Sequence, residues 1–377
     1  MHIALDGSDL SSTKFDGTTV YVRELLPRLA RLLHTAGHKV TVFSHSPIAP
    51  EVFGDTAEIN VTRGRRFWTQ TVLSRALFRV KPDLLFLPIQ TVPLYRPSNL
   101  KVVATIHDLD FLAYPKMYEW KNRLLLRWFS RVVVRNATKL IAVSEYSRKE
   151  IMKFYGRSQN DISVVYHGFD RKNFRPPVSM EEKAMALNNI QRKYAIPGNT
   201  VLFVGAMQPR KNINRLIDAF ELYKASGDKV NLVLVSGNGW REKEIMKRIQ
   251  NSSMLKDIHV LRKVPYRDLT ALYWNASVSV LVSIAEGFGL PVLEAMACGA
   301  PVLTSNTTAL AEIAHGAALL VEPKDGNATA KGLEKILTDS QTKKRLIEAG
   351  FDRVISFSWD KCAQETAVVI EKALEMV

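Results

Sequence analysis

The stretch from Ala285 to Gly299 carries two glutamates on either side of a glycine-rich turn. Glu286 comes before the turn, and Glu294 lies about one helical turn inside the helix that we expect to follow. Pro291 suits the first position of that helix and Gly299 suits the position just past its end, so the pattern predicts a helix of about eight residues. Because an apolar run precedes it, the whole segment is predicted to be a strand, a turn and a short helix.

The turn has the features of an anion-binding loop. We expect positive φ at Gly287 and Gly289, which would let the N–H groups of Phe288, Gly289 and Leu290 point at phosphate oxygens at the positive end of the helix dipole. Two carboxylates beside a phosphate would oppose its binding, but they could accept hydrogen bonds from sugar hydroxyls. The segment therefore predicts a sugar joined to a diphosphate, although the glycines alone are also typical of an ordinary strand-turn-helix.

The spacing of Glu286 and Glu294, with Gly-Phe-Gly-Leu-Pro between them, resembles the Glu-x7-Glu signature of retaining glycosyltransferases of the GT-B fold, group 1 (family 4 type). The resemblance implies two Rossmann-like domains that face each other across a cleft. It also implies a nucleoside diphosphate sugar as donor and a glycan or lipid-linked acceptor, in polysaccharide or glycolipid synthesis. In such an enzyme Glu286 would orient the donor sugar and Glu294 would hold the ribose hydroxyls.

A basic loop follows the first apolar run of the second half. Arg210 and Lys211 precede a predicted helix, a placement that brings two cations and a helix N-terminus to one anion, although such pairs are also common in solvated turns. Relatives in the family carry Gly-Arg and then a lysine five residues after that arginine. Here Ala206 occupies the arginine position and Lys211 the lysine position, so Arg210 would supply the second cation. The Pro-Arg-Lys-Asn loop resembles that of mannosyltransferases and favours GDP-mannose over a UDP-sugar.

Three further loops gain roles from the resemblance. His107 ends an apolar strand, where a histidine is more often structural, but the family places a donor-sugar contact there. Gly17 belongs to a loop that closes over the diphosphate in relatives, and Asp16 stands where they have another glycine. Val264 lies in a loop that packs on the nucleotide base.

No metal and no cofactor are expected. Asp108-Leu109-Asp110 spells the Asp-x-Asp of the other main glycosyltransferase fold, which binds manganese. GT-B enzymes instead hold the diphosphate with helix dipoles and cationic side chains, and the leaving phosphate takes the acceptor's proton, so no separate base is required. Lys211, Arg210 and the amides of the turn would stabilise the charge that develops on the diphosphate.

The pattern of apolar runs predicts an α/β fold with two doubly wound parallel sheets. Short runs rich in Val, Ile and Leu alternate with helical stretches, as in buried parallel sheets. The first-half runs are His2–Leu5, Val40–Phe43, Leu84–Leu87, Val102–Ile106, Leu140–Val143 and Ile162–Tyr166, and the second-half runs are Val201–Val204, Val230–Val235, His259–Leu261, Val278–Val282, Pro301–Thr304 and Ala318–Val321. We expect a first domain over residues 1–170, a linker and entry helix over 171–199, a nucleotide-sugar domain over 200–357, and a terminal helix over 358–377. The resemblance implies that this last helix returns to the first domain.

Composition limits the function classes. The 377 residues are 46% hydrophobic and 24% charged, enough to build two cores. The two cysteines are far apart, and no run of about 20 apolar residues occurs, so we expect a cytoplasmic chain that is neither secreted nor membrane-spanning. The net charge of +15 fits an anionic membrane surface or phosphorylated ligands, whereas no nucleic-acid-binding motif is present to favour nucleic acid.

Two basic stretches contain aromatic and aliphatic residues, at 63–81 and 116–135. Such helices can lie in the interface of an anionic membrane, which would place the chain on the inner face of the cell membrane. Helices that pack on a sheet show the same periodicity, so both interpretations stay open. Two other functions also stay open, a nucleotide-sugar epimerase of the same fold and a non-catalytic basic protein that binds lipid or nucleic acid.

Overall fold

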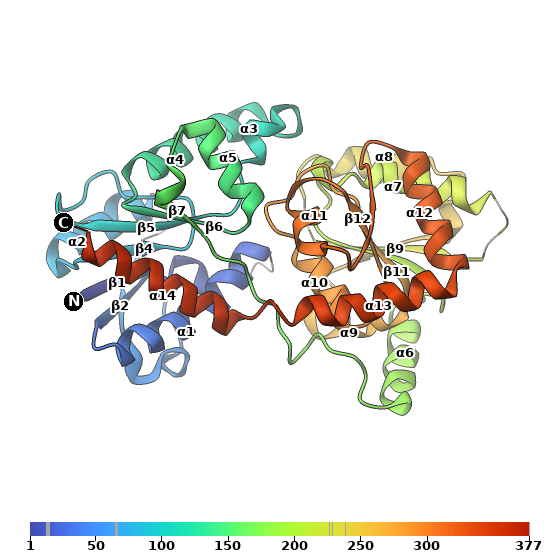
Figure 1. Cartoon of the computed structure of the whole chain (residues 1–377), viewed down its shortest axis with the longest axis horizontal. Coiled ribbons are helices and arrows are strands. Elements are labelled where there is room, and N and C mark those ends of the chain that lie inside the picture. The colour runs from blue at the N-terminus through green and yellow to red at the C-terminus, as the bar shows by residue number, and fades with distance from the viewer. Residues whose placement is uncertain (13–15, 65–66, 226, 228, 238, 377) are drawn as a thin grey trace. The chain divides into compact units, whose positions relative to one another are not determined.

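The computed structural model describes residues 1–12, 16–64, 67–225, 227, 229–237 and 239–376. It divides into two compact units (Figure 1). The first unit contains residues 1–168 and 357–377, and the second contains residues 169–356. The segment 171–199, expected as a linker and entry helix, lies within the second unit.

The first unit is built on a parallel sheet of seven strands. In spatial order these are β3 (Glu58–Val61), β2 (Lys39–Ser44), β1 (His2–Asp6), β4 (Leu84–Leu87), β5 (Lys101–Ile106), β6 (Lys139–Ala142) and β7 (Ile162–Val164). Six of the strands were predicted from the apolar runs. β3 was missed because its Glu-Ile-Asn-Val sequence forms a partly exposed edge strand and has no buried run.

Helices cover both faces of this sheet (Figure 1). They are α1 (Gly17–Thr35), α2 (Ser74–Val80), α3 (Asp110–Ala113), α4 (Trp120–Asn136), α5 (Glu145–Tyr155) and α14 (Trp359–Glu375). α14, the last helix of the chain, packs against α1 on one face, while α4 and α5 lie on the other. The terminal helix thus belongs to the first unit. Ser358 caps it by accepting a hydrogen bond from the Lys361 N–H at 3.1 Å.

The second unit repeats the architecture with six parallel strands. Their spatial order is β10 (Ile258–Arg262), β9 (Asn231–Ser236), β8 (Thr200–Val204), β11 (Ala276–Leu281), β12 (Val302–Ser305) and β13 (Leu319–Val321). All six were predicted, because every strand carries buried Val, Leu or Ile side chains.

Eight helices surround this second sheet in the part of the unit that the structure describes. They are α6 (Met180–Tyr194), α7 (Ile213–Lys224), α8 (Glu242–Gln250), α9 (Tyr266–Asn275), α10 (Leu290–Ala297), α11 (Thr308–Ala314), α12 (Gly326–Thr338) and α13 (Ser340–Val354). α7 packs on α12 over one face, and α9, α10 and α13 lie on the other (Figure 1). The α/β class with two Rossmann-like units is therefore confirmed.

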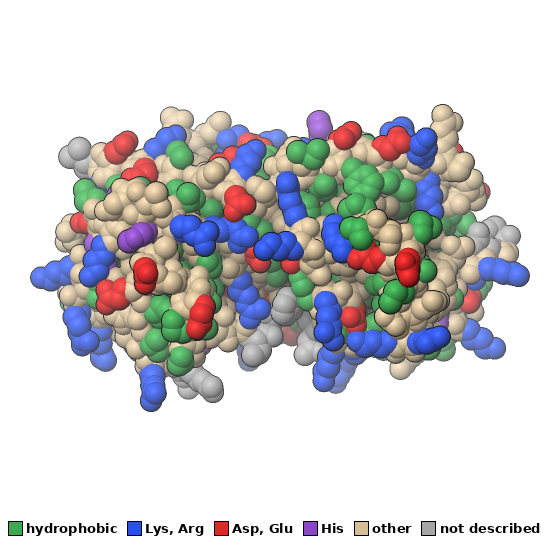
Figure 2. Space-filling view, turned by 90° about the horizontal axis from the view of Figure 1, so that it is seen from below, with side chains coloured by type: hydrophobic (Ala, Val, Ile, Leu, Met, Phe, Trp, Pro, Cys, Tyr) green, Lys and Arg blue, Asp and Glu red, His purple; other side chains and the backbone are tan. Residues whose placement is uncertain are grey.

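Two surface properties bear on function. Among the described residues, no helix is both long enough and apolar enough to cross a bilayer. In the face shown in Figure 2, Lys and Arg side chains lie among acidic and apolar ones.

Candidate functional site

The strand order of the second sheet reverses between β8 and β11: β9 and β10 extend the sheet on one side of β8, and β11, β12 and β13 extend it on the other. In doubly wound sheets, ligands bind beyond the carboxyl ends of the strands at this switch point. Arg210 and Lys211 follow β8, and Glu286 follows β11. The fold therefore brings the basic loop and the first signature glutamate to the place where a ligand is expected.

The basic loop is tied to its neighbour through the main chain. Residues Pro209–Lys211 form a single 3₁₀ turn, and the Arg210 carbonyl accepts a hydrogen bond from the Ile284 N–H at 2.8 Å. Asn212 has φ +60°, and its amide donates to the carbonyls of Val282 at 3.0 Å and Pro323 at 2.6 Å. Asparagine tolerates this left-handed backbone, so Asn212 fixes the loop that presents the two cations.

Glu286 is held from three sides. Its Oε2 accepts from Arg210 at 2.9 Å, and its Oε1 accepts from the Ser283 hydroxyl at 2.9 Å. Lys211 Nζ also pairs with Oε1. The glutamate is only 6% exposed and Lys211 8%, so this ion triad is shielded from water and carries one net positive charge.

The two cations keep Glu286 ionised. Burial by itself would raise the pKa of Glu286, but Lys211 and then Arg210 outweigh it and hold that pKa at about 2. Glu286 is therefore a carboxylate at any physiological pH. The carboxylate thus orients two cations at the switch point of the sheet.

The glycine turn leads into α10 largely as predicted. Gly289 has φ +113°, and a Cβ at this position would lie 2.6 Å from Leu310 Cδ2, so a larger residue would be strained here. Gly287 was expected to share the positive φ and does not, so that prediction was wrong. Pro291 falls in the first turn of α10, and Gly299 follows its end with φ +76°.

Glu294 projects from α10 into a different environment. Its Oε2 accepts a hydrogen bond from the Tyr273 hydroxyl at 3.0 Å, and the residue is 9% exposed. Burial, and to a lesser extent the charge of Asp170, raise the pKa of Glu294 to about 7. The two signature glutamates thus differ: one is ionised by its partners, and the other is close to protonation at neutral pH.

His107 lies at the carboxyl end of β5 in the first unit. Its Nε2 lies 2.8 Å from the Pro88 carbonyl; because a carbonyl oxygen can only accept, we assign the proton to Nε2, which leaves Nδ1 as an acceptor. Burial lowers the pKa of His107, so the ring is neutral. Tyr21 meets it edge-on, and the same tyrosine donates to or accepts from Thr105 at 2.9 Å. His107 is thus suited to accept a hydrogen bond from a hydroxyl and not to donate a proton.

The loop before α1 carries a structural role that the sequence did not indicate. Asp16 caps α1, because its Oδ1 accepts from the Thr19 N–H at 2.9 Å. Gly17 is the exposed first residue of the helix. Phe15, which precedes them, lies outside the described residues. The replacement of a family glycine by Asp16 therefore gives this helix a side-chain cap.

Val264 lies between β10 and α9 and is half-buried. Its predicted contact with the nucleotide base stays a prediction.

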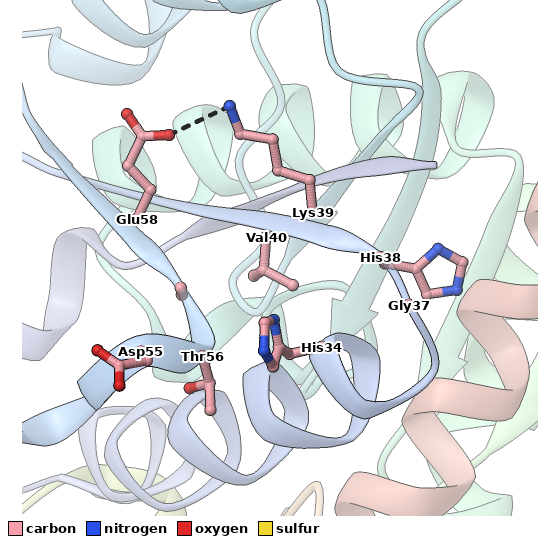
Figure 3. Close-up of a pocket in the computed structure, with 9 residues that line it drawn as sticks. His34, Gly37, His38, Lys39, Val40, Asp55, Thr56 and Glu58 are labelled. Carbon is pink, nitrogen blue, oxygen red and sulfur yellow. Dashed lines mark ion pairs between the residues drawn. The ribbon is translucent and has the colours of Figure 1, made fainter.

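A metal site is not found in the part of the chain that the structure describes. No three His, Cys, Asp or Glu side chains there are grouped to hold an ion, Asp108 and Asp110 included. A pocket of about 370 Å³ lies in the first unit, lined by His34, His38 and Glu58 among others, with an ion pair of 3.4 Å between Lys39 and Glu58 (Figure 3). Since Lys39 begins β2, this pocket is at the amino end of that strand, away from the strand end that carries His107.

Sequence reasoning missed three residues of the site. Ser283 lies three residues before Glu286 and could have been noticed by that spacing. Asn212 follows the cations directly, but only its backbone angle shows its role. Tyr273 is 21 residues from Glu294, and no pattern links the two.

Comparison with known proteins identifies the family. The chain matches the model described as Glycosyl transferases group 1 over residues 188–353, and the model described as Glycosyltransferase Family 4 over residues 15–173. It is 31% identical over 275 residues to the O-antigen chain mannosyltransferase B of Escherichia coli, covering 72% of this chain and 71% of that protein. The chain belongs to the group 1 glycosyltransferases.

Other relatives of this group 1 glycosyltransferase carry similar names. The O-antigen chain mannosyltransferase RfbU of Salmonella typhimurium is 27% identical, over 65% of this chain and 62% of that protein. Because the relatives named here are transferases, the epimerase and the non-catalytic binding protein that we considered find no support.

Solved structures agree on the fold. Sucrose-phosphate synthase of Thermosynechococcus elongatus superposes with a TM-score of 0.75 at 21% identity, covering 99% of this chain and 98% of that one. Anabaena HepE in complex with UDP-glucose has a TM-score of 0.74 at 17% identity, covering 99% and 100%. The fold of this glycosyltransferase is GT-B.

Proposed function

We propose that this glycosyltransferase transfers a hexose, with mannose as the first candidate, from a nucleoside diphosphate sugar to a glycan or lipid-linked acceptor, with retention of the anomeric configuration and without a metal ion. The observation that carries the proposal is the triad of Arg210, Lys211 and Glu286 at the β8–β11 switch point. The triad joins two cations, which would bind the diphosphate, to one carboxylate, which would face the donor sugar.

The charges of the triad suit the reaction. As the bond from the anomeric carbon to the phosphate breaks, negative charge develops on the diphosphate and positive charge on the sugar ring. Arg210, Lys211 and the N-terminus of α10 would stabilise the diphosphate, and each oriented donor contributes about 3 kcal/mol in comparable sites. The ionised Glu286 would stabilise the ring, and the departing phosphate would take the acceptor's proton.

The donor is proposed from two sources. The Pro-Arg-Lys-Asn loop and the names of the mannosyltransferase relatives favour GDP-mannose. The solved complex of HepE with UDP-glucose keeps a UDP-sugar as the alternative. The acceptor is proposed from the O-antigen relatives, whose names point to surface polysaccharide.

The experiment is a transfer assay with radiolabelled GDP-mannose or UDP-glucose and a membrane extract as acceptor source. We expect product with one donor, and NMR of the new anomeric centre should show retention. Glu286→Gln should abolish transfer, while Glu334→Gln, a matched change of an exposed glutamate on α12, should leave it intact. Transfer by Glu286→Gln at the wild-type rate would refute the proposed role.

The surface of α4 supports a position at the inner face of the cell membrane. Only Ser130, Val133 and Val134 of this helix are buried. Trp120, Leu124 and Trp128 are 63%, 52% and 46% exposed and follow each other at intervals of four residues, so they form one row.

The same side of α4 is cationic. Arg127 and Arg131 stand three residues after Leu124 and Trp128, and so adjoin the apolar row. The helix contains no Asp or Glu between residues 120 and 136. An apolar row flanked by arginines is complementary to an anionic lipid interface, where each cation contributes about 1 kcal/mol.

The other basic stretch, at 63–81, packs into its own unit. Trp68 is 4% exposed and donates to the Thr62 carbonyl at 2.9 Å, and Leu73 and Leu77 are buried. Arg65 and Arg66 lie outside the described residues. This stretch therefore packs on the core of the first unit, which was the other interpretation of its pattern. The membrane proposal rests on α4.

Sedimentation with vesicles tests the membrane proposal. At low salt, the protein should sediment with vesicles that contain anionic lipid and not with purely zwitterionic ones. The double variant Leu124→Ser, Trp128→Ser should lose this binding. Leu222→Ser, which changes an equally exposed leucine on α7, should keep it. Failure of the wild-type protein to sediment would refute the proposal.

A further inference from the structure

Tyr273 and Glu294 form a buried pair between α9 and α10. Tyr273 is 0% exposed at the carboxyl-terminal part of α9, and its hydroxyl lies 3.0 Å from Glu294 Oε2 on α10. The Phe174 ring meets the tyrosine ring edge-on at 5.8 Å and 76°. Packing therefore holds the phenol in one position relative to α10.

The direction of this hydrogen bond is settled by chemistry. Burial, and then the nearby charge of Glu294, raise the pKa of Tyr273 well above its usual range, so the phenol keeps its proton and donates it. A carboxylate can only accept. Within the described part of the chain, the second carboxylate oxygen, Oε1, makes no hydrogen bond, and Glu294 keeps 9% of its surface exposed.

We propose that Tyr273 is the positioning residue for Glu294: its phenol holds one carboxylate oxygen so that the other can accept hydrogen bonds from the ribose of the donor. This inference rests on the proposed function, since it takes a nucleoside diphosphate sugar as ligand. It assigns to Tyr273 a part in ribose recognition, and none in the chemistry at the anomeric carbon.

The pair also sets the protonation state of Glu294. The Tyr273 hydrogen bond lowers the pKa of Glu294, against burial, which raises it to about 7. Loss of the phenol therefore moves that pKa upward, and ribose binding that needs the carboxylate should then decline at a higher pH than in the wild-type protein.

The test uses Tyr273→Phe, which removes one hydroxyl and keeps the ring. Binding of GDP, UDP and ADP and of their 2′-deoxy and 3′-deoxy forms is measured by calorimetry. We expect the variant to bind the best ribonucleotide about tenfold more weakly, because a hydrogen bond to a charged group is lost, while it binds the deoxy form that lacks the contacted hydroxyl almost as the wild type does. In transfer assays KM for the donor should rise and kcat should stay, since a ribose contact is the same in ground and transition states.

The matched control is Tyr194→Phe. Tyr194 makes a hydrogen bond of the same kind, to Asp268 at 2.6 Å, on the partly exposed side of α9. This control should retain ribose discrimination and the wild-type pH dependence of binding. Equal effects of the two variants would mean that Tyr273 only stabilises the fold, which would overturn the inference.

Two further outcomes separate an error in the positioning role from an error in the proposed function. If the wild-type protein binds a ribonucleotide and Tyr273→Phe discriminates against the deoxy form as strongly as before, the positioning role is wrong and the proposed function survives. If the wild-type protein binds none of the nucleotides, both the proposed donor class and this inference are wrong.

Discussion

Replacing Glu294 by glutamine is expected to stabilise the second unit, and more at alkaline than at acidic pH. The amide carbonyl can still accept the Tyr273 hydrogen bond, but the side chain no longer carries a charge that burial disfavours. The increase in the free energy of unfolding would show that the native carboxylate at this position destabilises the fold.

The magnitude follows from the two pKa values. The pKa of Glu294 is about 7 in the folded chain, against an ordinary value of 4.5. At about 1.4 kcal/mol per pKa unit, this difference costs about 3 kcal/mol when the group is ionised in both states. Because the pKa of Glu294 is higher in the folded chain than in the unfolded chain, its ionisation does not destabilise the fold below about pH 4.5. The destabilisation grows as the pH rises from there through about 7. The cost is about 1 kcal/mol at pH 5 and about 3 kcal/mol at pH 8.

The assay is scanning calorimetry of the wild type and the variant at pH 5 and pH 8 in buffers of equal ionic strength. The extra gain at pH 8, about 2 kcal/mol, corresponds to an increase in Tm about 4–8 °C larger than at pH 5 for a unit of this size. An equal gain at both pH values, or a loss at pH 8, would refute the reasoning that burial controls the charge of Glu294.

Glu286→Gln is the control, and it should behave in the opposite way. The pKa of Glu286 is held at about 2, below its ordinary value, so its carboxylate stabilises the fold above about pH 4.5 and this stability is lost only as the pH falls through about 2. The variant should therefore lower Tm, by nearly the same amount at pH 5 and pH 8.

Three other results are expected. Lys211→Met should lower kcat/KM roughly 100-fold in the transfer assay, because one oriented cation of the diphosphate site is lost, and retention of full activity would contradict the proposed role. Chelation with EDTA should leave the rate of transfer unchanged, and a loss that added Mn²⁺ or Mg²⁺ restores would show that the metal-independent prediction is wrong. Asp16→Ala should cost about 1 kcal/mol in urea unfolding because α1 loses its cap, whereas an unchanged midpoint would show that this hydrogen bond does not contribute.

Much of the fold could be predicted from local sequence patterns. Buried parallel strands need continuous apolar runs, and these runs marked all the strands except β3, whose partly exposed edge position removes that requirement. The turn into α10 was equally local, because Pro291 and Gly299 delimit the helix by their own backbone preferences. The prediction of a positive φ at Gly287 was wrong, because glycine permits a positive φ but does not require one.

For the candidate site, too, the sequence indicated some features and the structure was needed for others. Glu286 could be named from the sequence because its spacing from Glu294 resembles the family signature, and Arg210 and Lys211 because they precede a helix and match a family loop. Their meeting follows from the fold, since the carboxyl ends of neighbouring parallel strands lie at one edge of a sheet. The sequence did not show that these residues pair, or that Ser283 donates to Glu286. It also did not show that the pKa of Glu286 is about 2 while that of Glu294 is about 7, because both values depend on burial and on the partners that the fold supplies. The amino-acid order by itself determined which groups follow the strands at the switch point, since strand ends are set locally. Only the tertiary structure decided their protonation and the exposure of α4, since both depend on which surfaces are removed from water.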